Sequence, residues 1–491
     1  MKSNVQPITR NIADTAYPQR LHLLIDGQWL GADGRNTLPV INPATGETLA
    51  GLPCATRDDL DHALEAAGRA YPKWRAVPPH ERGRIMKRAA DLLRERGERI
   101  ARIATIEEGK SIGETRIDLA RGADLFEFYG EEVRRTYGRV LAPRMPGVRM
   151  TVLKEPIGPV AAFAPWNFPI GNPCRKLGAP VAAGCPVILK PAEETPASAL
   201  EIARCLADAG VPDGVVNVVF GVPAEISSYL LKSPVIRKLS FTGSTRVGRE
   251  LAKLAAERMI RTTMELGGHA PVLVFDDVDV DQVLDASVQA KYRNAGQVCV
   301  SPTRYYIHEN IYQRFVQGFA ERARAVPVGD GLRESTQMGP LAHAGRPPYV
   351  ESMLDNARQH GAHFHTGGSR IAGPGYFFEP TVISDVPNTA RIMNEEPFGP
   401  IAILNPFSSF EEAIQQANRL PYGLAAYAFT GSPRLVNLLG EQIEAGMIGI
   451  NSHAISVPES PFGGMKESGH GSEEGPEGLD ACYVTKFVSE S

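Results

Sequence analysis

GPVAAFAP at residues 158–165 is a short apolar run that ends in proline, and four similar runs follow it. These are CPVILKP (185–191), GVVNVVFG (214–221), IRKLSFTG (236–243) and APVLVF (270–275). Segments with helical spacing lie between them, such as TPASALEIARCLADAG and TRVGRELAKLAAERM. Buried strands that alternate with helices are typical of a parallel, doubly wound sheet. This part of the chain therefore predicts an α/β fold.

The N-terminal third has a different sequence pattern, in which helical segments predominate. The first 20 residues are expected to form a loose arm, and HLLIDGQWL then predicts a strand, a turn and a second strand. Helical spacing covers residues 57–75 and 80–108. We expect these helices to pack beside the predicted sheet.

The C-terminal half predicts a second α/β unit and two unpaired strand edges. Strands and helices alternate again from about residue 286. Residues 138–158 suggest an extended hairpin, and CYVTKFVSE at 482–490 a lone strand. Exposed strand edges need partners, so we expect the chain to oligomerise.

Composition narrows the class of protein. The chain has 491 residues, of which 43% are hydrophobic and 22% charged, and its net charge is −4. This balance does not predict nucleic acid or an anionic membrane as a partner. The six cysteines lie far apart without zinc-ligand spacing. We expect a reduced, metal-free protein of the cytoplasm, with no secretory leader and no membrane span.

Cys299 is the first candidate for chemistry. It lies in NAGQVCVSPTR (294–304), among polar residues and close to Gly296, which permits close approach to a ligand. A free cysteine is more often a buried packing residue. A loop position in polar company favours a nucleophile, and both interpretations stay open on the residues alone.

Two more polar residues stand in apolar surroundings. Glu265, in MELGGHAP, is either a turn-capping carboxylate or a semi-buried general base with a raised pKa. Asn167, in FAPWNFPI, either ties down a loop or donates to an oxyanion.

Two strand ends carry features that suit a nucleotide. Gly243 and Ser244 turn the chain from a strand into a helix, whose first N–H groups suit a phosphate. Lys190 and Glu193 follow another strand, where a carboxylate can accept from ribose hydroxyls. Each feature alone also fits an ordinary helix start.

Together these motifs resemble the aldehyde dehydrogenase superfamily over roughly residues 20–490. The match rests on the order and spacing of PWNFP, LKPAEETP, FTGSTRVG, ELGGHAP, GQVCVSPTR, NEEPFGP and PFGGMKESGHG. The resemblance implies an NAD(P)-binding Rossmann-like domain (1–135 and 156–263), a catalytic α/β domain (264–455) and a bridging β element (136–155 and 456–491). It also implies homodimers or homotetramers.

The resemblance assigns roles position by position. Cys299 matches the nucleophile, Glu265 the general base, and Asn167 the oxyanion donor. The positions that match the cofactor site are Trp166, Lys190, Glu193, Gly243, Ser244, Glu396 and Phe398. Arg246 departs from the usual pattern towards NADP, while Glu193 and Glu194 oppose a 2′-phosphate, so NAD is the expected cofactor, with NADP possible.

The substrate is expected to be a dicarboxylate semialdehyde. RNAGQVCVSPTR and the C-terminal segment are similar to the branch that holds succinate-semialdehyde and 2-oxoglutarate-semialdehyde dehydrogenases. Arg175 and Arg293 match positions that hold the distal carboxylate, which a planar guanidinium suits. Ser456 is expected to line the same substrate tunnel. Each arginine could instead pair with a structural acid. Other hypotheses are a broad aliphatic or aromatic aldehyde dehydrogenase and a catalytically silent binding protein.

Overall fold

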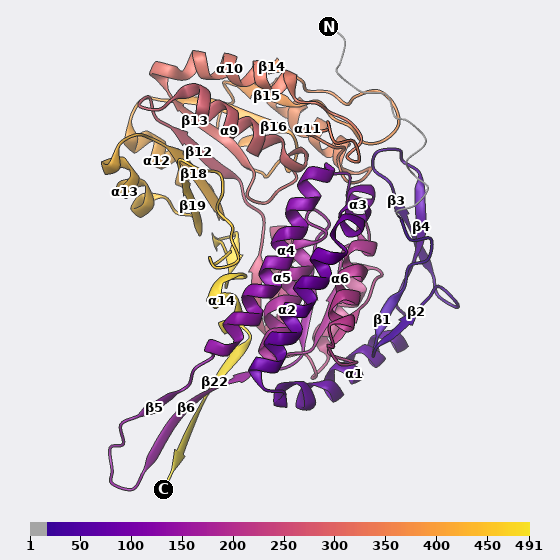
Figure 1. Ribbon diagram of the computed structural model, residues 1–491. Helices are drawn as coiled ribbons and strands as arrows, with labels where there is room; N and C mark the ends of the chain where they lie inside the picture. The colour runs from indigo at the N-terminus through magenta and orange to yellow at the C-terminus, as the bar shows by residue number, and fades with distance from the viewer. Residues whose placement is uncertain (1–16) are drawn as a thin grey trace.

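Two large sheets and a projecting three-stranded sheet make up the protein (Figure 1). The computed structural model describes residues 17–491, so most of the expected N-terminal arm lies outside the described residues. Within those residues no helix combines the length and the hydropathy that a bilayer span requires. The expected α/β fold with parallel sheets is confirmed, with antiparallel strands added at the edges.

The first sheet has the strand order β2-β1-β9-β8-β7-β10-β11-β21, and its five inner strands, from β9 to β11, are parallel. Its strands are β1 (Leu23–Ile25), β2 (Gln28–Leu30), β7 (Val160–Phe163), β8 (Val187–Lys190), β9 (Val216–Val218), β10 (Lys238–Thr242), β11 (Arg261–Glu265) and β21 (Gly469–His470). The helices that accompany it are α1 (Arg57–Ala76), α2 (Pro79–Glu95), α3 (Gly97–Glu108), α4 (Ile112–Glu132), α5 (Gly171–Ala183), α6 (Pro196–Asp208), α7 (Pro223–Lys232) and α8 (Thr245–Ala256). A separate hairpin joins β3 (Thr37–Ile41) to β4 (Thr48–Pro53).

The helical pattern over 80–108 is divided in two. α2 ends at Glu95 and α3 begins at Gly97, with Arg96 in a non-helical conformation between them. A Cβ at Gly97 would lie 2.8 Å from the Leu119 side chain of α4. The break therefore lets the backbone pass close to α4, which the helical spacing did not reveal.

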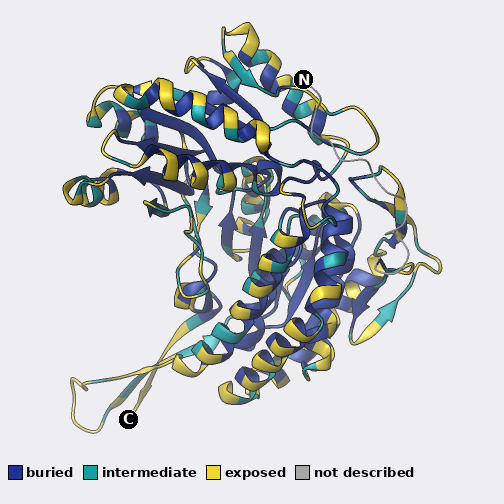
Figure 2. Cartoon of the chain, turned by 45° about the horizontal axis from the view of Figure 1, so that its top comes forward, coloured by how far each residue is buried: buried dark blue, intermediate teal, exposed yellow. Residues whose placement is uncertain are grey.

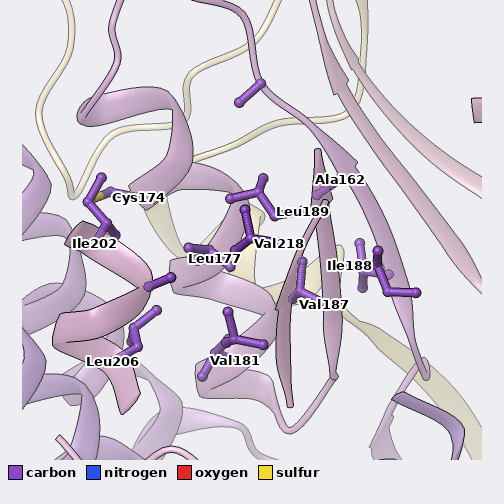
Figure 3. Close-up of a cluster of buried hydrophobic side chains, with 14 of the residues drawn as sticks. Ala162, Cys174, Leu177, Val181, Val187, Ile188, Leu189, Ile202, Leu206 and Val218 are labelled. Atoms are coloured by element: carbon purple, nitrogen blue, oxygen red, sulfur yellow. The ribbon is translucent and has the colours of Figure 1, made fainter. Parts of the chain in front are cut away.

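The core of this sheet explains why the apolar runs are strands. Side chains of β7, β8 and β9 pack against one face of α5 and α6, and Figure 3 shows Val187, Leu189, Leu177 and Leu206 among them. Such residues are removed from water, and each contributes about 1.5–3 kcal/mol of apolar burial. Cys174 belongs to the same cluster, as do Cys185, Cys205 and Cys482, so four of the six thiols are core residues.

The second sheet has the order β14-β15-β16-β13-β12-β18-β19 and is parallel except at β14. Its elements are β12 (Ala270–Val274), α9 (Val280–Tyr292), β13 (Pro302–His308), α10 (Tyr312–Ala325), α11 (Arg346–Gln359), β14 (His363–Thr366), β15 (Thr381–Ser384), β16 (Ile401–Phe407), α12 (Phe410–Asn418), β18 (Ala425–Phe429), α13 (Pro433–Gln442) and β19 (Met447–Ile450). Figure 2 shows both sheets buried and their helices exposed on the outer side.

The predicted hairpin and lone strand pair with one another. β6 (Arg149–Pro156) lies between β5 (Arg139–Leu141) and β22 (Tyr483–Glu490), all antiparallel. This three-stranded sheet projects from the body, and the C-terminus lies on it (Figure 1). The chain reaches β22 from the second sheet through β20 (Met465–Lys466), β21 and α14 (Gly475–Asp480), and β20 pairs with β17 (Tyr422–Gly423).

β11 belongs to the first sheet as far as Glu265. A domain boundary placed between residues 263 and 264 would therefore cut a strand. The division of the chain into three domains stays a prediction.

Candidate active site

Polar residues gather where the parallel strands of the first sheet end. β7 is paired on one side with β8 and on the other with β10, so the chain winds away from it in both directions. Ligands of doubly wound sheets bind at such a switch point, outside the carboxyl ends of the strands. The residues at or just after these ends are Trp166, Asn167, Lys190, Gly243, Ser244 and Glu265.

The β8 and β10 ends offer groups that suit a dinucleotide. The Lys190 ammonium forms an ion pair with Glu193, and burial raises the pKa of the Glu193 carboxyl. The Ser244 hydroxyl caps α8 by accepting from the Val247 N–H at 3.4 Å. A carboxylate suits ribose hydroxyls, and a helix start suits phosphates, so this edge fits NAD(P).

Glu396 and Phe398 reach this edge from the loop before β16. One Glu396 oxygen accepts from the Gly268 N–H at 3.3 Å, and a Cβ on Gly267 would lie 2.9 Å from the other oxygen. Burial raises the pKa of Glu396 to about 8. The Phe398 ring packs edge-on against Trp166, with centroids 5.6 Å apart. The two sheets therefore meet where the cofactor residues were predicted.

The turn before Cys299 is strained. Asn294, Ala295 and Gly296 all have left-handed backbones, with φ of 48°, 51° and 70°. A Cβ at Gly296 would lie 2.1 Å from the Gly399 carbonyl oxygen. Left-handed non-glycine residues cost of order 1–3 kcal/mol each and persist where the surroundings hold them. The sequence signalled only the glycine.

Hydrogen bonds hold this turn against the β7 end. The Asn294 N–H donates to both oxygens of Glu114 at 3.1 Å, and its side-chain amide donates to the Asn167 carbonyl at 2.9 Å. The Lys110 ammonium donates to the same carbonyl at 2.7 Å. The Asn167 Nδ2 donates to the Gln297 carbonyl at 3.0 Å. One N–H of this amide then remains for a ligand, because an amide nitrogen carries two.

Cys299 is half-buried beside Leu424, Met447 and Phe462. Burial raises the pKa of its thiol to about 12, and Glu396 and Glu265 act in the same direction. Arg175 and Arg293 oppose this shift. The thiol is therefore protonated at neutral pH in the absence of a further cation or a base.

Glu265 is a buried acid without a partner. Its side chain is 2% exposed, and among residues 17–491 neither carboxylate oxygen has a hydrogen-bond partner. Burial and then Glu473 raise its pKa well above the usual range, while Lys176 lowers it. The turn-capping interpretation is wrong, because a capping carboxylate would accept from backbone N–H groups.

A cavity of about 520 Å³ opens on Cys299 and is lined by Arg175, Arg293 and Ser456. Arg175 has an acid partner, since its Nε lies 2.5 Å from Glu474. Arg293 has no ion pair and no side-chain hydrogen bond in the described part of the chain; its guanidinium lies 5.4 Å from the Phe168 ring centroid. Each arginine was expected to bind either a substrate carboxylate or a structural acid. In the described part of the chain, only Arg175 pairs with an acid.

Sequence reasoning missed two cavity residues. Arg121 lies on α4, and Glu474 lies just before α14. Arg121 carries no local signal, because an arginine on a helix is ordinary. Glu474 stands in the polar segment GHGSEEG, and its two adjacent acids before glycine were the only hint.

The description "Aldehyde dehydrogenase family" belongs to a family model that matches residues 29–488. The chain belongs to the aldehyde dehydrogenase family. This aldehyde dehydrogenase is therefore an NAD(P)-dependent enzyme of the EC 1.2.1 class that oxidises aldehydes. Its predicted family and enzyme class are confirmed.

Similar proteins differ in substrate and cofactor. The aldehyde dehydrogenase is 48% identical to the putative 4-(hydroxymethyl)benzenesulfonate dehydrogenase TsaD2 of Comamonas testosteroni, over 95% of this chain and 97% of that protein. It is 39% identical to the succinate-semialdehyde dehydrogenase [NADP(+)] GabD of Escherichia coli, over 96% and 97%. The crystal structure of an NAD-dependent aldehyde dehydrogenase from Sinorhizobium meliloti has a TM-score of 0.97 and 33% identity, over 99% and 98%.

Proposed function

We propose that this aldehyde dehydrogenase oxidises an aldehyde that carries a second, anionic group, and that the reaction proceeds through intermediates on Cys299. The observation that supports this is the cavity at Cys299 with Arg293 in its wall, a half-buried guanidinium without an acid partner. A carboxylate or sulfonate of the ligand would supply the anion that a guanidinium binds well. A dicarboxylate semialdehyde, succinate semialdehyde or 2-oxoglutarate semialdehyde, is the first candidate.

Cys299 acts first. Its thiol first releases its proton to solvent water. The thiolate sulfur then attacks the carbonyl carbon, and the C=O electron pair moves to the oxygen. The alkoxide accepts from the remaining Asn167 N–H and the Cys299 backbone N–H; one such donor is worth about 3 kcal/mol. NAD(P), held by Lys190, Glu193, Ser244 and Glu396, would supply the acceptor for the hydride. Loss of the hydride leaves a thioester on Cys299.

Glu265 acts in the second half. A carboxylate without hydrogen-bond partners is available to take a proton from water, and its raised pKa makes it a stronger base. The hydroxide attacks the thioester carbon, the Cys299 thiolate leaves, and a carboxylic acid is released. A base at this position opposes transfer of the acyl group to another thiol.

The cofactor proposal is NAD. Glu193, paired with Lys190 at the end of β8, supports it because a carboxylate accepts from ribose hydroxyls and repels a 2′-phosphate. Arg246 is exposed and pairs with Glu250 on α8, which weakens the earlier argument for NADP.

An aromatic aldehyde with an anionic substituent is the second candidate. The ion pair between Arg175 and Glu474 supports it, since one of the two predicted carboxylate-binding arginines already has an anion. The relative named for 4-(hydroxymethyl)benzenesulfonate supports the same class.

The test is the initial rate of cofactor reduction with succinate semialdehyde, 2-oxoglutarate semialdehyde, hexanal, benzaldehyde and 4-formylbenzenesulfonate, each with NAD and NADP. We expect anionic aldehydes to exceed neutral ones at least tenfold in kcat/KM, about 1.4 kcal/mol of transition-state binding. Arg293→Ala should remove that advantage. A higher kcat/KM for hexanal or benzaldehyde than for the anionic aldehydes would overturn the proposal of an anionic substrate. No reduction with any aldehyde would indicate a catalytically silent protein.

We also propose the three-domain division and a homo-oligomer. The projecting sheet supports an oligomer because it exposes apolar side chains, among them Val140 (76% exposed), Phe487 (54%) and Leu153 (42%). Apolar patches on such a strand edge favour association with a second copy.

A further inference from the structure

Three arginines from distant parts of the chain line the cavity at Cys299. They are Arg121 on α4, Arg175 on α5 and Arg293 in the strained turn. Arg175 and Arg293 were predicted to hold a substrate carboxylate. Arg175 and Arg293 differ in their hydrogen-bond partners, and this difference determines which of them is free to bind a substrate anion.

Each guanidinium nitrogen of Arg175 already has a protein partner. Its Nε donates to Glu474, its Nη2 to the Ser456 hydroxyl at 3.3 Å and its Nη1 to Asn172 at 3.3 Å. The Ser456 hydroxyl in turn donates to the second Glu474 oxygen at 3.0 Å. Glu474 therefore occupies Arg175 and Ser456, two of the three predicted substrate-binding residues, as a substrate carboxylate would.

Glu474 holds this position at a backbone cost. Its φ of 60° and ψ of 175° lie in a region that only glycine enters easily. For another residue that conformation costs of order 1–3 kcal/mol. The carbonyl of Glu474 accepts from the Gly478 N–H at 2.9 Å, and Phe462 exchanges two backbone hydrogen bonds with Glu473 beside it. The surrounding backbone thus holds an acid where glycine would be relaxed.

Arg121 and Arg293 have no such partner. Within residues 17–491 neither forms an ion pair or a side-chain hydrogen bond. The acids that line the cavity near them accept from backbone groups: Glu114 from Asn294, and Asp118 from Ile170 at 3.3 Å. Burial and then Arg293 lower the pKa of Arg121, while the carboxylates of Asp118 and Glu474 act in the opposite direction without reversing the shift.

We propose that Arg121 and Arg293 bind the anionic end of the substrate, and that Glu474 determines this by occupying Arg175. This rests on the proposed function and favours its second candidate, the aromatic aldehyde with an anionic substituent, over the first. A four-carbon semialdehyde fits a site built on Arg175 and Ser456, which Glu474 blocks. The cavity of about 520 Å³, with Phe168 and Phe462 in its wall, suits an aromatic spacer between the aldehyde and the anion. The shared chemistry is an oxyanion, either carboxylate or sulfonate.

The experiment compares 4-formylbenzoate and 4-formylbenzenesulfonate with benzaldehyde, which lacks the anion. In Arg121→Gln and in Arg293→Gln we expect the ratio of anionic to neutral kcat/KM to fall at least tenfold, mainly through KM. Arg116→Gln is the matched control, because Arg116 lies on the same helix and its partners Glu98 and Glu334 are outside the cavity. It should leave the ratio unchanged. The better of the two anions identifies the oxyanion.

Glu474→Gly tests the second part of the proposal, that Glu474 keeps the substrate anion away from Arg175. It removes the acid and frees Arg175 and Ser456, so kcat/KM for succinate semialdehyde should rise at least tenfold; the thermal midpoint shows that the variant is folded at the assay temperature although Arg175 has lost its ion pair. Adding Arg175→Gln should abolish the rise. An unchanged ratio in the Arg121 and Arg293 variants, or no rise in Glu474→Gly, overturns the inference. A wild-type enzyme that oxidises no aldehyde would instead overturn the proposed function.

Discussion

The side-chain amide of Asn167 donates to the Gln297 carbonyl at 3.0 Å and so ties the end of β7 to the loop that carries Cys299. The Asn167 Oδ1 accepts from Asn172 at 3.1 Å, which fixes the orientation of the amide. The two interpretations of Asn167 are therefore compatible: one N–H holds the loop, and the other remains for an oxyanion.

Asn167→Ala should lower kcat/KM by about 10²–10³-fold, because it removes an oxyanion donor and loosens the Cys299 loop. Steady-state cofactor reduction measures the loss. Asn388→Ala changes an exposed amide on the loop before η4 (Arg391–Met393) and should have no effect. A similar loss in both variants would count against the proposed role.

Alkylation of Cys299 in the cofactor-free enzyme should depend steeply on pH. Its pKa is raised to about 12, so the thiolate is scarce at neutral pH and increases about tenfold per pH unit up to that value. Iodoacetamide labelling followed by peptide mass spectrometry separates Cys299 from Cys54, which is also partly exposed. A labelling rate that is flat between pH 6 and about 9 would show a thiolate already formed.

Glu265→Gln should separate the two halves of the reaction. The first turnover should still release one reduced cofactor per active site, and later turnovers should slow by about 10²–10⁴-fold. Because the pKa of Glu265 is raised, the wild-type steady-state rate should fall as the pH drops below that raised value. Rapid-mixing absorbance measures the burst. Glu250→Gln, on an exposed face of α8, is the control, and loss of the burst itself would contradict a role confined to deacylation.

Glu193→Gln should shift cofactor preference towards NADP by roughly tenfold, since it removes a carboxylate that repels the 2′-phosphate and leaves Lys190 without its partner. The ratio of kcat/KM for NAD and NADP measures the shift. Glu225→Gln, exposed on α7, should keep the wild-type ratio. An unchanged ratio in Glu193→Gln would indicate that the ribose 2′ position of the cofactor lies away from Glu193.

Phe487→Glu should weaken association of the subunits, because it places a charge on the exposed apolar strand β22. Analytical ultracentrifugation should show a smaller species than the wild type. Met259→Glu changes another exposed apolar residue, 88% exposed and outside the projecting sheet, and should not alter the mass. A wild type that sediments as a monomer would refute the proposed oligomer.

Local pattern was sufficient for the fold class and for most strand positions. The runs from GPVAAFAP to IRKLSFTG became adjacent buried strands of the first sheet, because apolar segments between helices have few alternatives to a central parallel sheet. APVLVF became β12 of the second sheet, a change of sheet that the pattern did not reveal. The break at Gly97 was not predictable, because it depends on contact with Leu119 of another helix.

The sequence by itself determined the α/β architecture, the family and the set of motifs that carry Cys299, Glu265 and Asn167. Only the tertiary structure decided which of those groups have partners. Glu265 has none, Arg175 is paired with Glu474 from nearly 300 residues away, and Arg121 faces the same cavity as Arg293. The physical reason is that a side chain's identity is local, whereas its charge environment depends on neighbours that chain folding brings together.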